Sequence, residues 1–367
     1  GYPVLVRPSY VLGGRAMEII HNEESLNQYI NSIISTFGKN PILIDRFLSD
    51  AIEVDVDVIA DKNLSIVAGI MEHIEEAGVH SGDSACTIPP HSLPAHTIKE
   101  IEKQSNTLAK ALKVVGLMNI QFAIKDIETD NPKIYILEVN PRASRTVPFV
   151  AKATGNQFAG IAARIMAGEK LSSFKILPWY KTNKISVKEA VFPFGRFPGV
   201  DTLLGPEMKS TGEAMGLAQN FGQAFAKSQM AVGSNLPKSG TLFISVKDSD
   251  KIKILPICKK LLNLGFDIIA TKGTSKYLEI NNIKVTKINK VSEGRPHLVD
   301  AIKDGLVNII FNTTEGEQSI KESFSLRRAA LSANIPYYTT LAGSKAATEA
   351  IISLNKDELT VKSIQSY

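Results

Sequence analysis

Apolar and polar residues follow different periods along this chain, and the change divides it into two regions. Up to residue 232, short strands of alternating pattern mix with helices that have one apolar face. We expect strands at 4–6, 16–20, 41–47, 53–60, 64–73, 118–126 and 134–140, and helices at 23–37, 96–112, 157–167 and 213–229. Residues 233–240 have the composition of a linker. The predicted domains are therefore 1–232 and 233–367.

Beyond the linker, strands and helices alternate with short loops. The pattern predicts strands at 241–246, 266–270, 283–288, 307–312 and 336–338, and helices at 251–264, from about 274, at 297–304, 319–333 and 343–354. Such alternation is typical of a parallel sheet covered on both faces. The predicted fold class is α/β, with mixed sheets in the first region and a parallel sheet in the second.

Hydroxyl and amide side chains gather at the carboxyl ends of the predicted parallel strands, where open α/β sheets bind ligands. The residues there are Ser245, Thr271, Thr274, Asn312 and Thr314. Together with nearby helix N-termini they suit a phosphate group. Ordinary helix capping uses the same residue types, so that interpretation stays open.

The last two strands expected before residue 141 form a hairpin around a polar loop. Because side chains alternate along a strand, Glu138 and Asn140 project from one face, and a symmetric hairpin sets Gln121 opposite Glu138. One carboxylate and two amide oxygens form a donor set that Mg²⁺ accepts together with phosphate oxygens. Arg142 and Arg145 follow at once and could neutralise phosphate charge. A solvated sheet face that ends in a proline turn is the alternative.

Strict alternation in the predicted strand 53–60 puts Glu53, Asp55 and Asp57 on one side and valines on the other. We expect a half-buried strand, and we expect Asp57 in particular to belong to a solvated acidic face. Glu53 stands at the start of the strand, where its carboxylate could accept hydrogen bonds from ribose hydroxyls.

Two loops of the first region contain groups that suit ligands. Gly13 and Gly14 lie between two short strands, where glycine N–H groups can approach phosphates, and Arg7 precedes them. A plain hairpin turn is the alternative. The loop after His73, which includes His80, is rich in side chains that can ligate a cation or hold an amine, although histidines of this kind are more often structural.

Composition narrows the class of protein. The 367 residues, 44% hydrophobic and 22% charged, suit two soluble globular domains, with room for a third. A net charge of +5 without a dense basic stripe does not indicate nucleic acid. We find no apolar segment long enough to span a membrane and no secretory signal. Cys86 and Cys258 suit packing in a reducing cytoplasm. The chain opens on Gly1 rather than Met, so we expect a fragment that lacks an N-terminal portion.

Long motifs in order along the chain resemble the carbamoyl phosphate synthetase large-subunit family, specifically its C-terminal part. The motifs are residues 7–18, 71–75, 78–84, Glu138-Val139-Asn140-Pro141-Arg142, Phe197-Pro198-Gly199-Val200-Asp201 and 293–297. The resemblance implies that residues 1–232 are most of a second ATP-grasp unit, an α+β domain that phosphorylates carbamate. It implies that residues 233–367 form a methylglyoxal-synthase-like allosteric domain.

The resemblance also assigns roles to matching positions. For ATP it implies Arg7, Gly13, Gly14, Arg46, Leu48, Glu53, Val79, His80, Ser81, Gln121 and Glu138. For Mg²⁺ or Mn²⁺ it implies Gln121, Glu138 and Asn140, and for K⁺ it implies Glu53, His73, Glu75, Glu76, Val79 and Ser81. Arg142 and Arg145 match catalytic arginines near the transferred phosphoryl group. The activator ornithine matches Glu75, Asp83, Glu189 and Thr339. The nucleotide effector, UMP or IMP, matches Ser245, Lys251, Thr271, Thr274, Lys290, Asn312 and Thr314.

By this resemblance the enzyme is an ATP-dependent, glutamine-hydrolysing ligase that feeds pyrimidine and arginine synthesis. A carbamate oxygen attacks the γ-phosphorus of ATP in line, without a covalent enzyme intermediate. The glycine flap would exclude water from labile carbamate. The implied partners are a glutaminase small subunit and the first half of the large subunit, in a cytoplasmic oligomer without nucleic acid or membrane. Without those partners we expect the chain to be inactive in the overall reaction.

Three other functions compete with this one. Another ATP-grasp ligase or a biotin-dependent carboxylase would share the metal hairpin, although the second domain argues against both. A pure effector-binding module is an alternative from a different class. Methylglyoxal synthase activity would need an acid near the strand end Asn312-Thr313-Thr314, which offers none.

Overall fold

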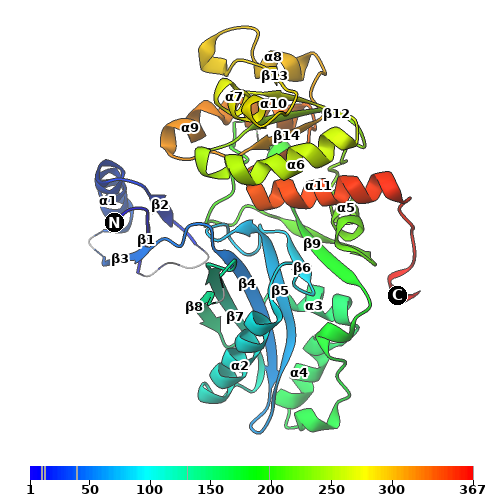
Figure 1. Cartoon of the computed structure of the whole chain (residues 1–367). Coiled ribbons are helices and arrows are strands. Elements are labelled where there is room, and N and C mark those ends of the chain that lie inside the picture. Colours follow the sequence, from blue (N-terminus) through cyan, green and yellow to red (C-terminus); the bar gives the residue numbers. More distant parts are fainter. Residues whose placement is uncertain (10, 12–13, 39, 130, 198, 367) are drawn as a thin grey trace. The chain divides into compact units, whose positions relative to one another are not determined.

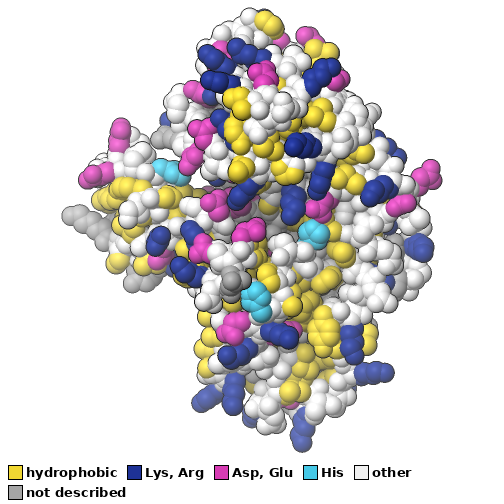
Figure 2. Space-filling model, in the orientation of Figure 1, with side chains coloured by type: hydrophobic (Ala, Val, Ile, Leu, Met, Phe, Trp, Pro, Cys, Tyr) yellow, Lys and Arg dark blue, Asp and Glu magenta, His cyan; other side chains and the backbone are white. Residues whose placement is uncertain are grey.

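The computed structural model describes residues 1–9, 11, 14–38, 40–129, 131–197 and 199–366. It divides into two compact units, Gly1–Ala190 with Leu204–Gln219, and Val191–Leu203 with Asn220–Tyr367. Each unit is described by itself. Figure 2 shows basic and acidic side chains interspersed over the surface of both units on the face in view.

A seven-stranded sheet forms the centre of the first unit, in the order β10-β9-β6-β5-β4-β7-β8 (Figure 1). Its strands are β4 (Ile52–Ala60), β5 (Ser65–Glu76), β6 (Cys86–Ile88), β7 (Gly116–Lys125), β8 (Lys133–Asn140), β9 (Ile185–Val191) and β10 (Gly212–Ala218). The helices packed on it are α2 (Ala95–Ala111), α3 (Val147–Thr154) and α4 (Phe158–Met166). The predicted α+β character of the first region is confirmed, since strands paired in antiparallel fashion share one unit with helices.

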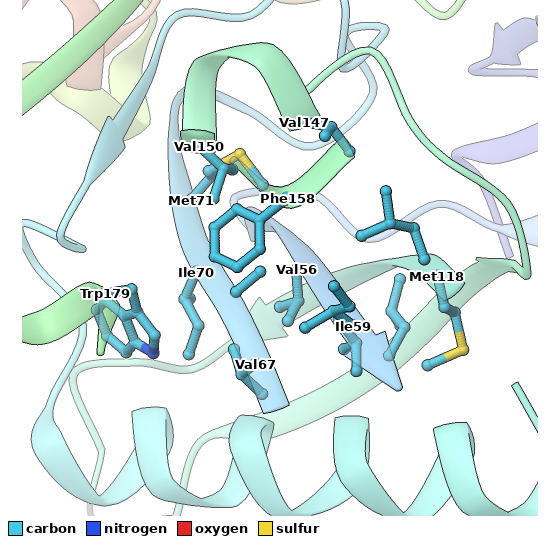
Figure 3. Packing of buried hydrophobic residues seen from close by; sticks show 14 of the residues in the cluster. Val56, Ile59, Val67, Ile70, Met71, Met118, Val147, Val150, Phe158 and Trp179 are labelled. Atoms are coloured by element: carbon cyan, nitrogen blue, oxygen red, sulfur yellow. The ribbon is translucent and has the colours of Figure 1, made fainter. Parts of the chain in front are cut away.

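Strand register gives β4 a row of buried valines on one side and a row of acids on the other. Val54 and Val56 of β4 pair with Phe122 and Ile120 of β7, and all four side chains are fully buried. They belong to one apolar cluster to which α2, α3 and α4 contribute, and Figure 3 shows this packing around β4 and β5. The alternate residues of β4 are the acids Glu53, Asp55 and Asp57, so one alternating pattern sets both the valine row and the acidic row.

A smaller sheet in the order β2-β1-β3 accompanies a helix in the first unit. The elements are β1 (Val4–Pro8), β2 (Glu18–Ile20), α1 (Glu23–Phe37) and β3 (Ile42–Arg46). The Asn22 side chain accepts a hydrogen bond from the Ser25 N–H and caps α1, as the sequence predicts.

A parallel sheet forms the centre of the second unit, in the order β13-β12-β11-β14-β15. Its strands are β11 (Gly240–Ser245), β12 (Phe266–Ala270), β13 (Thr286–Lys287), β14 (Ile309–Asn312) and β15 (Tyr337–Tyr338). The helices are α5 (Phe221–Ala231), α6 (Lys251–Asn263), α7 (Lys272–Ile280), α8 (Leu298–Lys303), α9 (Glu317–Glu322), α10 (Phe324–Ser332) and α11 (Leu341–Lys356). The predicted α/β sheet is thereby confirmed.

Both faces of the parallel sheet are covered. Phe243 and Ile310 are cross-strand neighbours and pack with residues of α8 and α10 in one apolar cluster. Leu242 and Ile244, which alternate with Phe243, are fully buried as well. Burial on both faces explains why these strands read as continuous apolar segments.

Two predicted helices are wrong. Residues 213–229 do not form one helix: β10 occupies the first half and pairs with β9, and the helix α5 begins only at Phe221. Gly212 and Gly216 weaken a helix there, so sheet pairing decides the conformation. The predicted helix 319–333 is interrupted at Ser323, which separates α9 from α10.

The compact units differ from the predicted division at 232/233 in two segments. Helix α5 and residues 191–203 both group with the second unit. α5 does so because it packs along α11: a Cβ on Gly222 would lie 2.5 Å from the Glu349 carbonyl oxygen.

The cysteines and the helices can be compared with two further predictions from the sequence. Cys86 and Cys258 are both free and buried, which fits the predicted role in packing. Among the described residues, none of the helices is both long and apolar enough to cross a membrane.

Candidate functional site

The β7–β8 hairpin pairs Gln121 with Glu138 and Asn119 with Asn140. Directly paired side chains lie on the same face of a sheet, so these four polar groups are neighbours. The predicted Gln121–Glu138 pair is therefore present.

The hairpin reaches this pairing by a route that symmetry did not predict. Near the turn Lys125 pairs with Lys133, which is one residue short of the assumed symmetric register. Phe122 pairs with Ile136, so Leu137 is an extra residue in β8 and forms a bulge before Glu138. The bulge cancels the offset and restores the expected pair.

Hydrogen bonds hold the three candidate metal ligands in fixed orientations. The Asn140 amide nitrogen donates to the Glu138 carboxylate at 2.6 Å, and the Gln121 amide nitrogen donates to the Ser81 hydroxyl at 2.9 Å. Arg142 donates to the Asn140 amide oxygen at 3.3 Å. With their nitrogens engaged, the two amides present oxygen atoms beside one carboxylate, and this donor set fits a hard divalent cation. Among the described residues there is no group of three or more His, Cys, Asp or Glu arranged for a metal.

The acidic face of β4 is buried, so the prediction of a solvated Asp57 is wrong. Asp57 is only 2% exposed and accepts hydrogen bonds from the Thr146 hydroxyl at 2.6 Å and the Asn119 amide at 3.0 Å. Helix α3 covers this part of the face: a Cβ on Gly69, the cross-strand partner of Asp57, would lie 2.8 Å from Val150. Burial raises the pKa of Asp57 to about 7.

His73 and Asp55 form a buried ion pair beside Asp57. The His73 Nε2 lies 3.0 Å from the Asp55 carboxylate, and both side chains are almost completely buried. Burial alone would raise the pKa of Asp55, but the hydrogen bond and charge of His73 outweigh it and lower the pKa. The same contact raises the pKa of His73 against the effect of burial. His73 thus has the structural partner that its residue type led us to expect.

Glu53 lies at the start of the same face. Burial raises its pKa to about 7, with the charge of His73 acting in the opposite direction. The nearby Gly78 backbone N–H also acts to lower the pKa of Glu53. The half-buried Glu75 accepts a hydrogen bond from the Ala85 N–H at 2.7 Å, and desolvation raises its pKa.

The loop after β5 is held from two sides. The Lys188 ammonium of β9, which is 2% exposed, donates to the Ser81 carbonyl at 3.2 Å. The buried Asp83 carboxylate accepts the backbone N–H groups of Lys209 and Ser210 at 2.7 and 2.9 Å. The His80 N–H donates to the Gly205 carbonyl at 2.8 Å, and burial lowers the pKa of the His80 ring.

The remaining residues predicted for ATP lie at the edges of this region. Arg7 and Arg46 are exposed on β1 and β3, and Leu48 follows β3. A Cβ on Gly78, next to Val79, would lie 2.9 Å from the Phe47 ring, so the segment with Leu48 approaches this loop.

The glycine flap is described only in part. Gly13 lies outside the described residues. Gly14 has φ +71°, and a Cβ there would lie 2.0 Å from the Pro206 carbonyl oxygen, so only glycine fits this approach. Arg145, near the proposed transferred phosphoryl group, donates to the Met208 sulfur of the same segment.

A cavity of about 450 Å³ opens in the second unit at the carboxyl ends of β11 and β14. Five residues predicted for the effector line it: Ser245, Thr271, Lys290, Asn312 and Thr314. The Ser245 and Thr271 hydroxyls lie 2.9 Å apart, so the strand ends meet as the parallel sheet predicts. The Lys290 ammonium lies 3.6 Å from the Glu322 carboxylate, which also lines the cavity.

Two predicted effector residues do not line this cavity. The Lys251 ammonium pairs with the Asp248 carboxylate at 2.6 Å, and the Thr274 hydroxyl accepts the Val246 N–H at 3.2 Å. Thr339, predicted with Glu75, Asp83 and Glu189 for ornithine, belongs to the second unit, whereas those three acids belong to the first.

Sequence reasoning missed the residues that support the site. These residues are Asn119 and Thr146, which bond to Asp57, and Lys188, which bonds to the Ser81 carbonyl. Each is a polar residue of a type that usually lies on the surface, so the sequence offered no reason to select it. Strand β9 was not predicted, although the alternation of Ile185 and Val187 with polar residues was a usable signal.

Comparisons with known proteins give two matching domain families. Residues 1–174 match the carbamoyl-phosphate synthase L chain ATP-binding domain, and residues 253–339 match the MGS-like domain. The chain is 54% identical to the carbamoyl phosphate synthase large chain of Mesorhizobium japonicum and 52% identical to that of Methanobrevibacter smithii. Both alignments cover all of this chain but only 33% and 34% of the relatives, so the chain spans about a third of their length.

Among solved structures, the biotin carboxylase–β,γ-ATP complex from Campylobacter jejuni has 18% identity and a TM-score of 0.49. That similarity covers 63% of this chain and 57% of the carboxylase. With two matching domains and more than half of its residues identical to the first relative along its whole length, the chain belongs to the carbamoyl phosphate synthase large-chain family.

Proposed function

We propose that this chain supplies the unit of a carbamoyl phosphate synthase, an ATP-dependent ligase, that phosphorylates carbamate. The observation that carries the proposal is the hairpin register that brings Gln121, Glu138 and Asn140 together, with Arg142 and Arg145 directly after them. Family membership supplies the reaction class, and the donor set supplies the reason why ATP would bind here with a divalent cation.

The residues of the chain take separate parts in this reaction. Arg142 and Arg145 offset the negative charge on the transferring phosphoryl oxygens, which is where phosphoryl-transfer enzymes gain most of their acceleration. The buried Glu53 accepts hydrogen bonds from the ribose hydroxyls, and the His80–Ser81 segment lies against the nucleotide. The closely packed turn at Gly14 excludes water from carbamate.

Gln121, Glu138 and Asn140 would hold Mg²⁺ or Mn²⁺. When bound, the divalent ion would neutralise phosphate charge and orient the γ-phosphoryl group. The half-buried loop with Glu75, His80 and Ser81 suits K⁺, because it offers carboxylate, hydroxyl and carbonyl oxygens that are partly shielded from water. Glu53, His73, Glu76 and Val79 complete that proposed cation set.

The cavity of the second unit supports control by a nucleoside monophosphate such as UMP or IMP. Hydroxyls from two strand ends and the Lys290 ammonium meet there, and charge-assisted bonds are the strong contributors to phosphate binding. Ornithine as an activator at Glu75, Asp83, Glu189 and Thr339 belongs to the same proposal. The proposal also includes a glutaminase small subunit and the further large-chain segments present in the relatives as partners. It includes an oligomeric complete enzyme and a cytoplasmic location.

The test is Mg²⁺-dependent ATP binding to the 367-residue chain. Glu138→Gln removes the one carboxylate of the metal set and should weaken Mg²⁺-ATP binding by about tenfold or more, since bonds to charged groups contribute about 1.5–3 kcal/mol. Glu128→Gln, at an exposed position in the loop of the same hairpin, is the matched control. Binding of Mg²⁺-ATP by the Glu138→Gln variant as tightly as by the wild type would refute the metal assignment.

A further inference from the structure

The guanidinium of Arg145 is held by a group that the sequence analysis did not select. Its Nη1 donates to the sulfur of Met208, which lies 63 residues further along the chain. A second observation places the same two groups together, because a Cβ on Gly82 would lie 3.0 Å from the Arg145 Nη1 and 3.2 Å from the Met208 sulfur. Three segments that are far apart in the sequence therefore meet at this guanidinium.

Met208 belongs to a short segment of the first unit, residues 205–210, that we call the clamp. The buried Asp83 carboxylate accepts the backbone N–H groups of Lys209 at 2.7 Å and of Ser210 at 2.9 Å. At the other end of the clamp, its first carbonyl accepts a backbone N–H of the loop after β5 at 2.8 Å. These hydrogen bonds lie on both sides of Met208 in the sequence, so the backbone that carries the sulfur is fixed against that loop.

The loop leaves room for the guanidinium by means of Gly82. A Cβ at this position would also lie 3.2 Å from the His80 Nδ1, which accepts the Gly82 N–H at 3.0 Å. Burial lowers the pKa of His80, and the charge of Arg145 acts in the same direction. The imidazole, the thioether and the guanidinium thus converge on Gly82, and the absence of a side chain there is what allows them to do so.

A thioether is chemically suited to orient a cation that has to act elsewhere. The methionine sulfur is an uncharged, weak hydrogen-bond acceptor, so it can fix the direction of one N–H without offsetting the positive charge of the guanidinium. A carboxylate in the same place would neutralise that charge and compete with phosphoryl oxygens for it. Because the guanidinium is a planar fork, fixing one of its N–H groups also sets the direction in which the others point.

We propose that Met208 is a positioning residue that orients the guanidinium of Arg145 toward the phosphoryl group that is transferred. This inference rests on the proposed function, because it takes Arg145 to act at the γ-phosphoryl group of ATP. ADP lacks that group, so Met208 should contribute to the affinity for ATP and not to the affinity for ADP. A residue that only stabilised the clamp would affect both nucleotides alike.

The test is calorimetry of Mg²⁺-ATP and Mg²⁺-ADP binding to the 367-residue chain and its variants. Met208→Leu keeps the apolar bulk but removes the acceptor, so the ratio of ATP affinity to ADP affinity should fall by about fivefold, as expected for the loss of one hydrogen bond. Met208→Gln supplies an oxygen acceptor on a side chain of similar length and should retain most of the ratio. Met166→Leu, at a position of α4 that is 70% exposed, is the matched control and should behave as the wild type.

A double-mutant cycle shows whether the sulfur acts through Arg145. Arg145→Ala should lower the ratio at least as far as Met208→Leu does. Addition of Met208→Leu to Arg145→Ala should then change the ratio no further, because the sulfur has already lost its partner. Losses that add in the double variant would overturn the proposal, and so would an equal loss of ATP and ADP affinity in Met208→Leu.

The same measurements separate a failure of this inference from a failure of the proposed function. If Arg145→Ala lowers the ratio and Met208→Leu leaves it unchanged, only the role of Met208 is refuted. If Arg145→Ala leaves the ratio unchanged, the assignment of Arg145 to the transferred phosphoryl group is wrong, and the role of Met208 is refuted with it. A wild-type chain that binds neither nucleotide would refute the proposed ATP site itself and, with it, the role of Met208.

Discussion

Replacement of Asp57 by asparagine should change how the stability of the first unit depends on pH. Asp57 accepts hydrogen bonds from Thr146 and Asn119, and it lies under α3 with almost no exposed surface. Burial disfavours the ionised carboxylate more than the two hydrogen bonds favour it, which raises the pKa from 3.8 to about 7. The folded unit therefore retains the Asp57 proton at pH values where the unfolded chain has lost it.

The sign of the effect follows from proton binding. Between about pH 4 and pH 7 the folded state binds more protons at Asp57 than the unfolded state, so the free energy of unfolding falls as pH rises. A tenfold change in a proton-binding constant corresponds to about 1.36 kcal/mol. The whole contribution is on the order of 4 kcal/mol, and about 3 kcal/mol of it is lost between pH 5 and pH 8. The asparagine side chain of the variant does not titrate, so the difference in stability should move in favour of Asp57→Asn by about 3 kcal/mol over this interval.

The assay uses the single tryptophan of the chain. Trp179 lies in the apolar core of the first unit and is 3% exposed, so its fluorescence reports the unfolding of that unit alone (Figure 3). Urea titrations of wild type and Asp57→Asn at pH 5, 6, 7 and 8 give the difference in unfolding free energy at each pH. The same buried groups, including Glu53, Asp55 and His73, are present in both proteins and largely cancel in that difference. Asp45→Asn, at an exposed position of β3, controls for the loss of one carboxyl group.

The reasoning would be refuted by parallel pH profiles. If wild type and Asp57→Asn lose stability equally from pH 5 to pH 8, then Asp57 does not retain its proton in the folded state. A variant that is less stable by the same amount at every pH would show that the hydrogen bonds of the carboxylate outweigh its burial.

Three other predictions concern the second unit and the whole chain. Gly222→Ala should lower the stability of the second unit by about 1–3 kcal/mol, because its Cβ would lie 2.5 Å from the Glu349 carbonyl oxygen and force α5 away from α11; an unchanged thermal transition by circular dichroism would contradict this. Lys290→Ala should weaken UMP binding by about 1.5–3 kcal/mol and Thr271→Ala by about 1 kcal/mol, since only the lysine makes a charge-assisted bond; equal losses in calorimetry would argue against a phosphate at Lys290. The 367-residue chain, which spans about a third of its relatives, should form no carbamoyl phosphate from bicarbonate, glutamine and ATP; detection of labelled product would refute that expectation.

The local pattern of apolar and polar residues was sufficient to predict those helices and strands whose sequence signals lie within a few residues. Asn22 with the apolar face of 23–37 specified α1 and its cap, and the alternation of 53–60 specified β4. The strand–helix alternation after residue 240 specified a parallel sheet, since short connections of that kind allow little else. The Gln121–Glu138 pair was predicted correctly only because the bulge at Leu137 cancels a one-residue error in the assumed register.

Only the tertiary structure decided which polar groups are buried. Asp57 reads as a surface acid in its own strand, and it is Thr146, 89 residues away, that covers it and bonds to it. Residues 212–218 form a strand because they can pair with the edge of β9. The helix and strand propensities of the segment itself do not contain this information. The Asp201–Arg327 pair joins residues 126 positions apart. The periodicity of a segment shows which of its faces can be buried. Whether a polar side chain on that segment is desolvated or paired depends on which distant segment packs against it. The packing of the whole unit decides this.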